Sequence, residues 1–260
     1  MPSWIARLVE LQPVGHGSGS FRTSNAFGAG PRLFGGLIAA QALAAAGATV
    51  DPSRLPQSLH AYFIRGGRVG VDVDYDVETT RDGRSFATRR VTASQEDVPI
   101  FEMLVSFHRP EETWTGTAPL VRGYRWPRPP PSSSPEGWMG HFETWWRLAY
   151  GRNGLPNRSG SAPPNPSRTT RWCGPALTFV SDIGMVSVAR PPGRYEPGPG
   201  GAASLDHALW LHRPVDPHQW HCYDAVAVSH NDARGLAFGS ISDSAGALVA
   251  SVAQESLWRI

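Results

Sequence analysis

Residues 33–46 carry the most continuous hydrophobic pattern in the chain, with Gln41 as the one polar side chain among Leu, Phe, Ile, Ala and Gly. Ala and Leu favour the helix, and here apolar positions surround the whole helix instead of forming one stripe. The segment therefore predicts a helix that is enclosed by other structure. It is shorter than the roughly 20 apolar residues that a membrane span requires.

Segments with the patterns of β-strands follow this helix. Residues 71–78 alternate strictly between apolar and polar side chains, which is the period of a half-buried strand. The Arg-Asp-Gly-Arg sequence at 81–84 is typical of a hairpin turn. The predicted strands are 58–65, 71–78, 85–94 and 100–108. One buried helix beside an antiparallel meander predicts the α+β class, with the helix lying on the sheet.

The last third of the chain repeats the pattern of the first. Residues 176–188 form a second helical candidate, and residues 204–213 resemble 58–65 when one inserted residue is allowed. Residues 232–237 match 82–87, and 247–253 match 99–105 as a closing strand. Matches in the same order indicate an internal duplication, so we expect two copies of one helix-on-sheet unit.

The two predicted units are separated by a stretch of different composition. Eleven of the 24 prolines lie between residues 110 and 170, and the aromatic patch 138–150 interrupts this stretch as a strand or a short helix. Proline-rich sequence of this kind is typical of linkers and irregular loops. We therefore expect an N-terminal unit at 1–110, a linker at 111–137 and a C-terminal unit at 138–260.

The charged residues exclude several kinds of protein. All 24 basic side chains are Arg, and with 22 acidic residues the net charge is +2. Without lysine the chain cannot form a P-loop, a pyridoxal phosphate Schiff base or a lysine-dependent aldolase site. No basic stripe is interleaved with aromatic residues, so no nucleic-acid partner is expected.

The cysteine content and the apolar runs predict whether disulfides stabilise the protein and where in the cell it resides. With only two cysteines, Cys173 and Cys222, a disulfide framework is not expected. The first residues lack the apolar region of a signal peptide, and no apolar run approaches 18 residues. We therefore expect a cytoplasmic protein that does not enter a membrane.

Both halves resemble the acyl-CoA thioesterase II family, whose members have a double hotdog fold. The resemblance is carried in the first half by Arg32–Gly36 with Gln41–Leu43, Leu59–Arg65 and Arg81–Val91, and in the second half by Val180–Asp182, Ser204–Pro214 and Val249–Glu255. These stretches keep the order and the approximate spacing of the family. The resemblance implies two hotdog units in one pseudo-dimeric chain, each with a helix wrapped by an antiparallel sheet.

The resemblance also implies a catalytic group. In the family an Asp, a Thr and a Gln hold and activate a water molecule, and these positions are Asp182, Ser204 and Gln254 in this sequence. Serine stands here in place of the family's threonine. The replacement keeps the hydroxyl and removes the methyl group that restricts the threonine rotamer. We expect this change to loosen the water site without destroying it.

Residues for substrate binding are predicted at the start of the first helix and in one strand. Gly35 and Gly36 would let a thioester carbonyl approach backbone N–H groups that stabilise an oxyanion, although the two glycines can also serve helix packing alone. Arg89 and Arg90 can bind the phosphates of coenzyme A, or they can be a solvated part of the sheet.

No metal or redox cofactor is expected. The histidines His212, His218 and His221 are close in sequence, but no paired Cys or acidic ligand accompanies them at the spacing of a metal site. The thioesterase chemistry that the resemblance implies needs only a carboxylate, a hydroxyl and an amide around one water molecule.

The predicted activity is hydrolysis of an acyl thioester, with acyl-CoA or an acyl-carrier thioester as substrate. Two alternatives remain open at this stage. The chain can be a specialised biosynthetic hotdog enzyme, for example a dehydratase acting on a carrier-bound acyl chain, or a non-catalytic acyl-binding protein. A homo-oligomer is also possible, because exposed sheet edges often pair.

Overall fold

A computed structural model describes residues 9–15, 19–24, 28–29, 32–111, 143–147, 157–162, 173–193, 196–198, 201–215 and 221–259. The strands are β1 (Gln12–Pro13), β2 (Ser20–Thr23), β3 (Gly28–Ala29), β4 (Arg32–Leu33), β5 (Leu55–Phe63), β6 (Val73–Asp82), β7 (Phe86–Gln95), β8 (Val98–His108), β9 (Glu143–Arg147), β10 (Asn157–Ala162), β11 (Ala202–Ser204), β12 (Asp206–Leu211), β13 (His221–Asn231), β14 (Arg234–Ser242) and β15 (Leu248–Trp258). The helices are α2 (Gly35–Ala48), α3 (Cys173–Ser181) and α4 (Met185–Val188).

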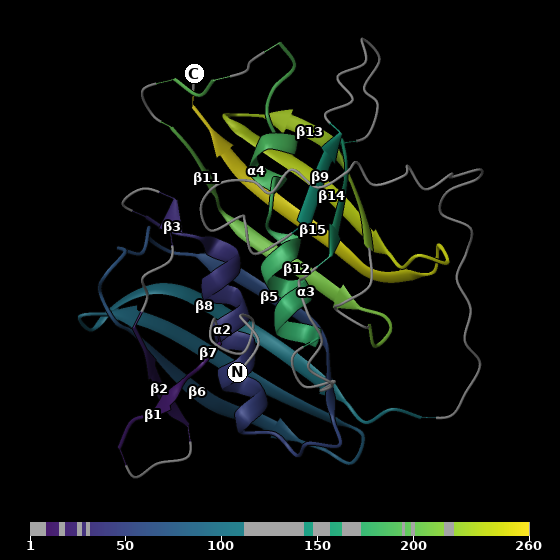
Figure 1. Cartoon of the computed structure of the whole chain (residues 1–260). Helices are drawn as coiled ribbons and strands as arrows, with labels where there is room; N and C mark the ends of the chain where they lie inside the picture. Colours follow the sequence, from purple (N-terminus) through teal and green to yellow (C-terminus); the bar gives the residue numbers. More distant parts are fainter. Residues whose placement is uncertain are drawn as a thin grey trace.

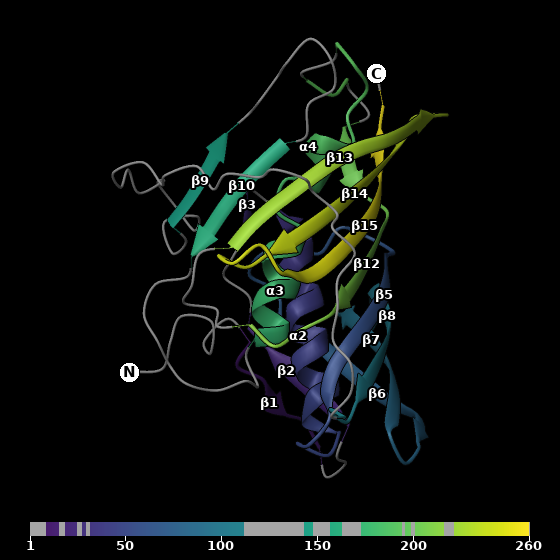
Figure 2. The same ribbon diagram turned by 90° about the vertical axis from the view of Figure 1, so that its right-hand side faces the viewer.

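Most of these strands form one large antiparallel sheet. Its order is β1-β2-β6-β7-β8-β5-β12-β15-β14-β13-β10-β9, and β11 pairs with β15 beside β12. In Figures 1 and 2 the strands of the first half lie together at one end of the molecule and those of the second half at the other. The two halves are joined where β5 pairs with β12, with Leu59 opposite Leu209.

The strand order confirms the predicted internal duplication. Reading outward from the junction, the first half has β5, β8, β7 and β6, and the second half has β12, β15, β14 and β13. In each half the helix precedes the innermost strand along the chain, and the last strand of the meander returns to pair with it. Two copies of one helix-on-sheet unit therefore share a single sheet.

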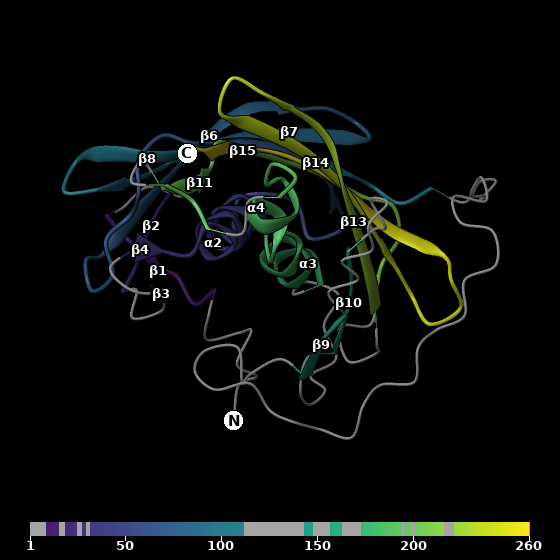
Figure 3. The same ribbon diagram turned by 90° about the horizontal axis from the view of Figure 1, so that it is seen from above.

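The first helix is enclosed on all sides, as its hydrophobic pattern predicts. Ten of the residues of α2 are buried, and their positions run around the helix. Seen from above, the sheet curves around one side of α2 and α3, which lie next to each other (Figure 3). The single polar side chain, Gln41, accepts a 2.6 Å hydrogen bond from the buried Tyr75 hydroxyl, so the helix buries no unpaired polar group here.

The second helix differs from its prediction. Residues 176–188 were expected to form one helix, but α3 already begins at Cys173 and ends at Ser181, and the short α4 follows separately. The break lies at Gly184, whose φ of 80° is left-handed and incompatible with a continuous helix. This interruption brings Asp182 to the end of α3 instead of the middle of a longer helix.

Most of the predicted strands are confirmed, with shifts of a few residues at their ends. Two of the hairpins turn through residue pairs that both have positive φ, Glu96–Asp97 and Asp232–Ala233, which is the geometry that matches the twist of paired strands. The aromatic patch 138–150 contains strand β9. The predicted linker 111–137 lies outside the described residues except for Glu111.

Candidate active site

The start of helix α2 has no local side chain that accepts a hydrogen bond from its first backbone N–H groups. The residue before the helix, Phe34, has an extended backbone and no capping side chain, and the first turn contains no acidic residue. The first N–H groups of any helix have no partner within the helix, and the positive end of the helix dipole favours a carboxylate there. Asp182 supplies one from the other half of the chain: Gly36 N–H donates to its Oδ2 at 2.8 Å, in a buried bond.

The two glycines at this helix start are required by close packing. A Cβ on Gly35 would lie 2.7 Å from the ring of Phe63 and 2.9 Å from Asp182 Oδ2. A Cβ on Gly36 would lie 2.5 Å from the carbonyl oxygen of Phe179 in α3. Helix packing and the approach of a carboxylate therefore both depend on these glycines. Their predicted contact with a substrate carbonyl stays a prediction.

Asp182 follows directly after α3 and is only 6% exposed. The neighbouring Tyr223 hydroxyl donates a 2.6 Å hydrogen bond to the carbonyl oxygen of Ser181. Burial, and to a smaller extent the negative charge of Asp182, raise the pKa of Tyr223 well above its ordinary value of 10. The phenol therefore stays protonated and continues to donate this bond, which helps to hold the backbone that carries Asp182.

The three residues predicted to form one catalytic group come together from separate elements. Ser204 is the last residue of β11, and Gln254 lies on β15 with no exposed surface. Gln254 Nε2 donates to Ser204 Oγ at 2.9 Å, and Ser204 Oγ is 3.4 Å from Asp182 Oδ1 as a long hydrogen bond. A carboxylate oxygen, a hydroxyl and an amide thus converge on one point beside the start of α2. This arrangement can hold a water molecule and remove a proton from it.

A histidine adjoining this group was not predicted. His207 on β12 is 1% exposed, and its Nδ1 lies 2.6 Å from Gln254 Oε1. Its Nε2 lies 2.8 Å from Ser181 Oγ. The signal was present in the sequence, because strand alternation places His207 on the same face as the buried Leu209, and a polar residue on that face needs buried partners.

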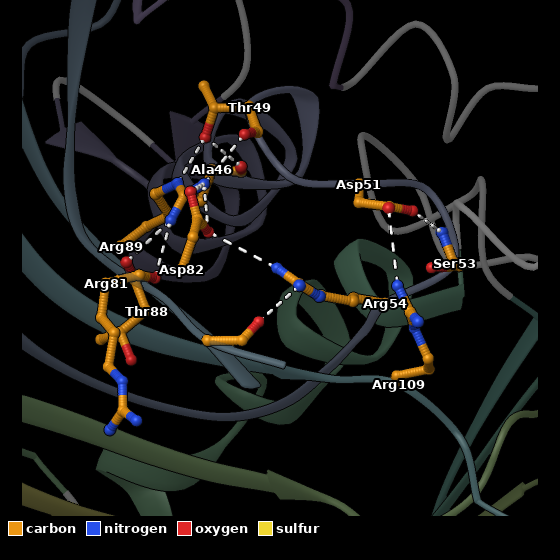
Figure 4. A network of polar contacts seen from close by, with 11 residues as sticks. Ala46, Thr49, Asp51, Ser53, Arg54, Arg81, Asp82, Thr88, Arg89 and Arg109 are labelled. Atoms are coloured by element: carbon orange, nitrogen blue, oxygen red, sulfur yellow. Dashed lines mark hydrogen bonds and ion pairs between the residues drawn. The ribbon is translucent and has the colours of Figure 1, made fainter. Parts of the chain in front are cut away.

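The structure is incompatible with the predicted role of Arg89 in binding phosphates. Its side chain is 2% exposed and donates five hydrogen bonds, to Thr49 Oγ1 and O, Arg81 O, Thr88 O and Asp82 Oδ2 (Figure 4). All five N–H donors of a guanidinium are thereby used, and a ligand cannot reach them. Arg89 instead ties strand β7 to the end of α2 and to the β6–β7 hairpin.

Arg90, the neighbouring residue, faces the opposite side of the sheet. Its side chain is 57% exposed and forms an ion pair with Glu102 at 3.1 Å. Successive residues of a strand point to opposite faces, so the burial of one arginine and the exposure of the next have the same cause. Arg90 remains accessible to a ligand.

The described residues contain neither a metal-binding cluster nor a helix that could span a membrane. No group of three or more His, Cys, Asp or Glu side chains in that part of the chain is arranged to hold a metal ion. His218, one of the three histidines considered above, lies outside it. Within the same residues, no helix combines the length and the apolar character that crossing a membrane would require.

Comparisons with known proteins extend over both halves of the sheet. Residues 23–108 match the family model described as the acyl-CoA thioesterase N-terminal domain, and residues 108–258 match the acyl-CoA thioesterase C-terminal domain. Acyl-CoA thioesterase 2 of Haemophilus influenzae is 30% identical over 88% of this chain and 88% of its own length.

Solved structures of other proteins are similar to this chain in fold. The acyl-CoA thioesterase II TesB2 of Mycobacterium marinum has a TM-score of 0.81 and 30% identity, and the match covers 98% of this chain and 96% of that one. A hot dog fold protein of Alicyclobacillus acidocaldarius has a TM-score of 0.79 at 18% identity, with 100% and 99% of the two chains covered. The expected α+β double hotdog is thereby confirmed.

Proposed function

The chain belongs to the acyl-CoA thioesterase family, and from this premise we propose that Asp182, Ser204 and Gln254 hydrolyse the thioester bond of acyl-CoA. The observation that carries the proposal is the convergence of the three side chains beside the start of α2, within hydrogen-bond distance of one another. Neither the similar proteins nor the geometry of the described residues favours a dehydratase or a non-catalytic binding protein.

The first step is attack by water. Ser204 Oγ and the second N–H of the Gln254 carboxamide orient a water molecule next to Asp182 Oδ1, and the carboxylate accepts its proton as the new C–O bond forms. General-base catalysis of this kind contributes about 10²–10⁴-fold in rate. The Gly36 N–H bond to Oδ2 holds the carboxylate in place while Oδ1 faces the water.

The thioester carbonyl oxygen becomes an oxyanion in this step. We assign its stabilisation to the first turn of α2, where the helix dipole is positive. Because Gly36 N–H is bonded to Asp182, the N–H of Gly35 is the donor that we assign to the oxyanion. A side chain at Gly35 would occupy the space between this helix start and the carboxylate.

Collapse of the intermediate completes the reaction. The carbonyl re-forms, the C–S bond breaks, and the sulfur of coenzyme A leaves with the electron pair. The thiolate takes the proton held by Asp182, so that one acyl-CoA and one water give one carboxylic acid and one free thiol. The aspartate returns to its ionised state for the next cycle.

The proposal is tested by following free thiol release from a panel of acyl-CoA esters. We expect hydrolysis by the parent and a loss of about 10²–10⁴-fold in kcat for Asp182→Asn. Asp232→Asn is the matched control, because Asp232 is exposed in a hairpin turn whose positive φ asparagine also accepts. An Asp182→Asn enzyme as active as the parent would show that the assigned base is wrong.

Arg90 is the accessible member of the predicted phosphate-binding pair, and we propose that it contacts the nucleotide end of coenzyme A. Arg90→Ala is then expected to raise KM for acyl-CoA by about threefold, as for one partly exposed ionic contact. KM for the matching acyl-pantetheine, which lacks the nucleotide, should stay unchanged. Equal changes for both substrates, or no change, would contradict this contact.

Three further proposals concern the source of the acyl group, the cellular compartment and the oligomeric state. We propose that the acyl group comes from fatty acid metabolism, that the enzyme acts in the cytoplasm and that it forms a homo-oligomer. A chain-length series of acyl-CoA and acyl-carrier thioesters, cell fractionation and light scattering of the purified protein test the three in turn.

A further inference from the structure

His207 is completely buried beside the proposed catalytic group, yet the mechanism above gives it no part. It projects from β12 toward the helices, and both ring nitrogens lie within hydrogen-bond distance of a polar side chain. Burying a polar ring without partners would cost free energy, and here both nitrogens are paired. The partners are Gln254 on one side and Ser181, the residue before the proposed base, on the other.

The chemistry of these partners determines where the imidazole proton lies. Ser204 Oγ donates its one hydrogen to Asp182 Oδ1, so it can only accept from Gln254, and the Gln254 NH₂ must face it. Gln254 Oε1 therefore faces His207, and a carbonyl oxygen only accepts hydrogen bonds. Nδ1 must therefore carry a hydrogen, because two lone pairs at 2.6 Å would repel each other. Ser181 Oγ donates its one hydrogen to Thr178 O at 2.9 Å and can then accept from Nε2–H of the charged ring. It can also turn that hydrogen to Nε2 of the neutral ring, so Nδ1–H is present in both states.

The hydrogen bonds consequently run in one direction. His207 Nδ1–H donates to Gln254 Oε1, Gln254 Nε2–H donates to Ser204 Oγ, and the Ser204 hydroxyl donates to Asp182 Oδ1. If the carboxamide were rotated by 180°, its oxygen would face Ser204 and its NH₂ would face Nδ1–H. The ring nitrogen and the amide would then present hydrogens to each other, and the amide would no longer donate toward the water.

We propose that His207 is a positioning residue, which holds the Gln254 carboxamide with its NH₂ toward Ser204 and the attacking water. The proposal rests on the proposed function, since it concerns the orientation of a group assigned to that reaction. His207 does not touch the substrate in this scheme. His207 affects the rate only through the orientation of Gln254. A residue that merely stabilised the fold would affect the rate whether or not Gln254 were present.

The first test compares kinetic constants of His207→Leu and His207→Asn. We expect His207→Leu to lower kcat on the order of tenfold with little change in KM, because a misplaced orienting group acts on the reaction step. His207→Asn should recover much of this loss, because its amide can place an N–H close to the position of Nδ1. His212→Leu is the matched control, since His212 also bonds to a serine hydroxyl but lies outside the chain of bonds to Asp182.

A double-mutant cycle tests whether the effect passes through Gln254. In a Gln254→Leu background, His207→Leu should not reduce kcat further. If the two losses multiply, or if His207→Leu leaves kcat unchanged in the parent background, the positioning role is overturned. The Asp182→Asn variant distinguishes this failure from a failure of the proposed function. If Asp182→Asn is active, the whole mechanism is wrong. If it is inactive, the mechanism is supported and only the role of His207 is overturned.

A spectroscopic measurement on the unaltered enzyme covers the case in which the variants do not fold. Nitrogen NMR of enzyme labelled at histidine should show a hydrogen on Nδ1 of His207, in the neutral and in the charged state of the ring. Assignment of the resonance uses the conservative His207→Asn variant or, if that is unfolded, the perturbation by Ser181→Ala. A neutral ring with its hydrogen on Nε2 and a bare Nδ1 would overturn the proposal.

Discussion

The starts of the two long helices occupy corresponding places in the duplicated fold, but they differ in chemistry. Asp182 follows Gly174 by eight residues, and Leu43 follows Gly35 by the same eight. At the start of α2, the position of a Gly35 Cβ is 2.9 Å from Asp182 Oδ2. At the start of α3, the position of a Gly174 Cβ is 3.5 Å from Leu43 Cδ2. The start of α2 thus faces a carboxylate that directly follows α3, whereas the start of α3 faces a methyl group of Leu43 in the middle of α2.

The two helix starts also differ in the backbone N–H groups that they can offer to a carboxylate. Gly36 donates its N–H to the carboxylate, whereas the corresponding residue after Gly174 is Pro175, which has no N–H to donate. Beside Gly174 lies a cavity of about 250 Å³ with a mostly apolar lining that includes Leu55, Pro56, Leu177 and Leu211. Polar residues such as Gln57, His212 and Arg213 also line this cavity, but no aspartate or serine is among its lining residues.

This difference shows what duplication within one chain allows. In a symmetric dimer of single hotdog units both helix starts would have to be identical, since one sequence would build both. Here each half has its own sequence, so a polar group can be assembled at one end while the other end serves packing. Substitutions that make the two helix starts more alike test this difference.

The largest effect is expected when the α2 end receives the side chain of the α3 end. Asp182→Leu should lower kcat by about 10²–10⁴-fold, because the base is lost. Adding Leu43→Asp should not restore activity, since Pro175 cannot donate an N–H to the new carboxylate. Thiol release by the two variants, with circular dichroism as a check of folding, measures both. Activity recovered in the double variant would mean that the two ends are chemically interchangeable.

A pair of glycine substitutions compares the two helix starts directly. Gly35→Ala and Gly174→Ala would each bring a Cβ within 3 Å of a neighbouring side chain, so each should cost about 1–3 kcal/mol of unfolding free energy. Only Gly35→Ala should also reduce kcat, by roughly tenfold or more, because it displaces the Asp182 carboxylate. Denaturant unfolding and steady-state kinetics of the two proteins are needed. Equal kinetic losses would place both helix starts in the reaction.

The contribution of a single hydroxyl at the α2 end is smaller. Ser204→Ala should reduce kcat by about tenfold, since one hydrogen bond to the water and to Asp182 is lost, a difference of about 1 kcal/mol or slightly more. Ser204→Thr keeps the hydroxyl and should stay within about threefold of the parent, since only a methyl group is added. Both are read from kcat with a saturating acyl-CoA. If the threonine and alanine variants were equally impaired, the space around Ser204 would matter more than its hydroxyl.

The smallest effect is expected at the cavity beside α3. Leu211→Phe enlarges one partly buried lining residue, and we expect kcat and KM within about twofold of the parent, the range of substitutions that touch no functional group. The same acyl-CoA panel serves as the measurement. A selective rise in KM for long acyl chains would instead show that the substrate reaches this end of the molecule.

The elements themselves could be predicted from the sequence, because their signals are local. The apolar run of residues 33–46 and the alternation of 71–78 depend only on how side chains are spaced along a helix or a strand. The end of α3 was not predicted, because helix propensity at 176–188 hides the left-handed Gly184. Arg89 and Arg90 show a further limit: two adjacent arginines look alike in sequence, while the pleat of β7 buries one and exposes the other.

For the candidate site, the sequence determined the three side chains and, through a resemblance, their grouping. It also excluded lysine-based chemistry outright, since the chain contains no lysine. Two contacts become visible only in the folded chain: the base caps a helix start 146 residues away, and His207 lies behind Gln254. The first contact depends on the pairing of β5 with β12 and on the packing of α2 against α3, and the second on the pairing of β12 with β15. Such long-range geometry results from the whole folded chain, and no local pattern of residues encodes it.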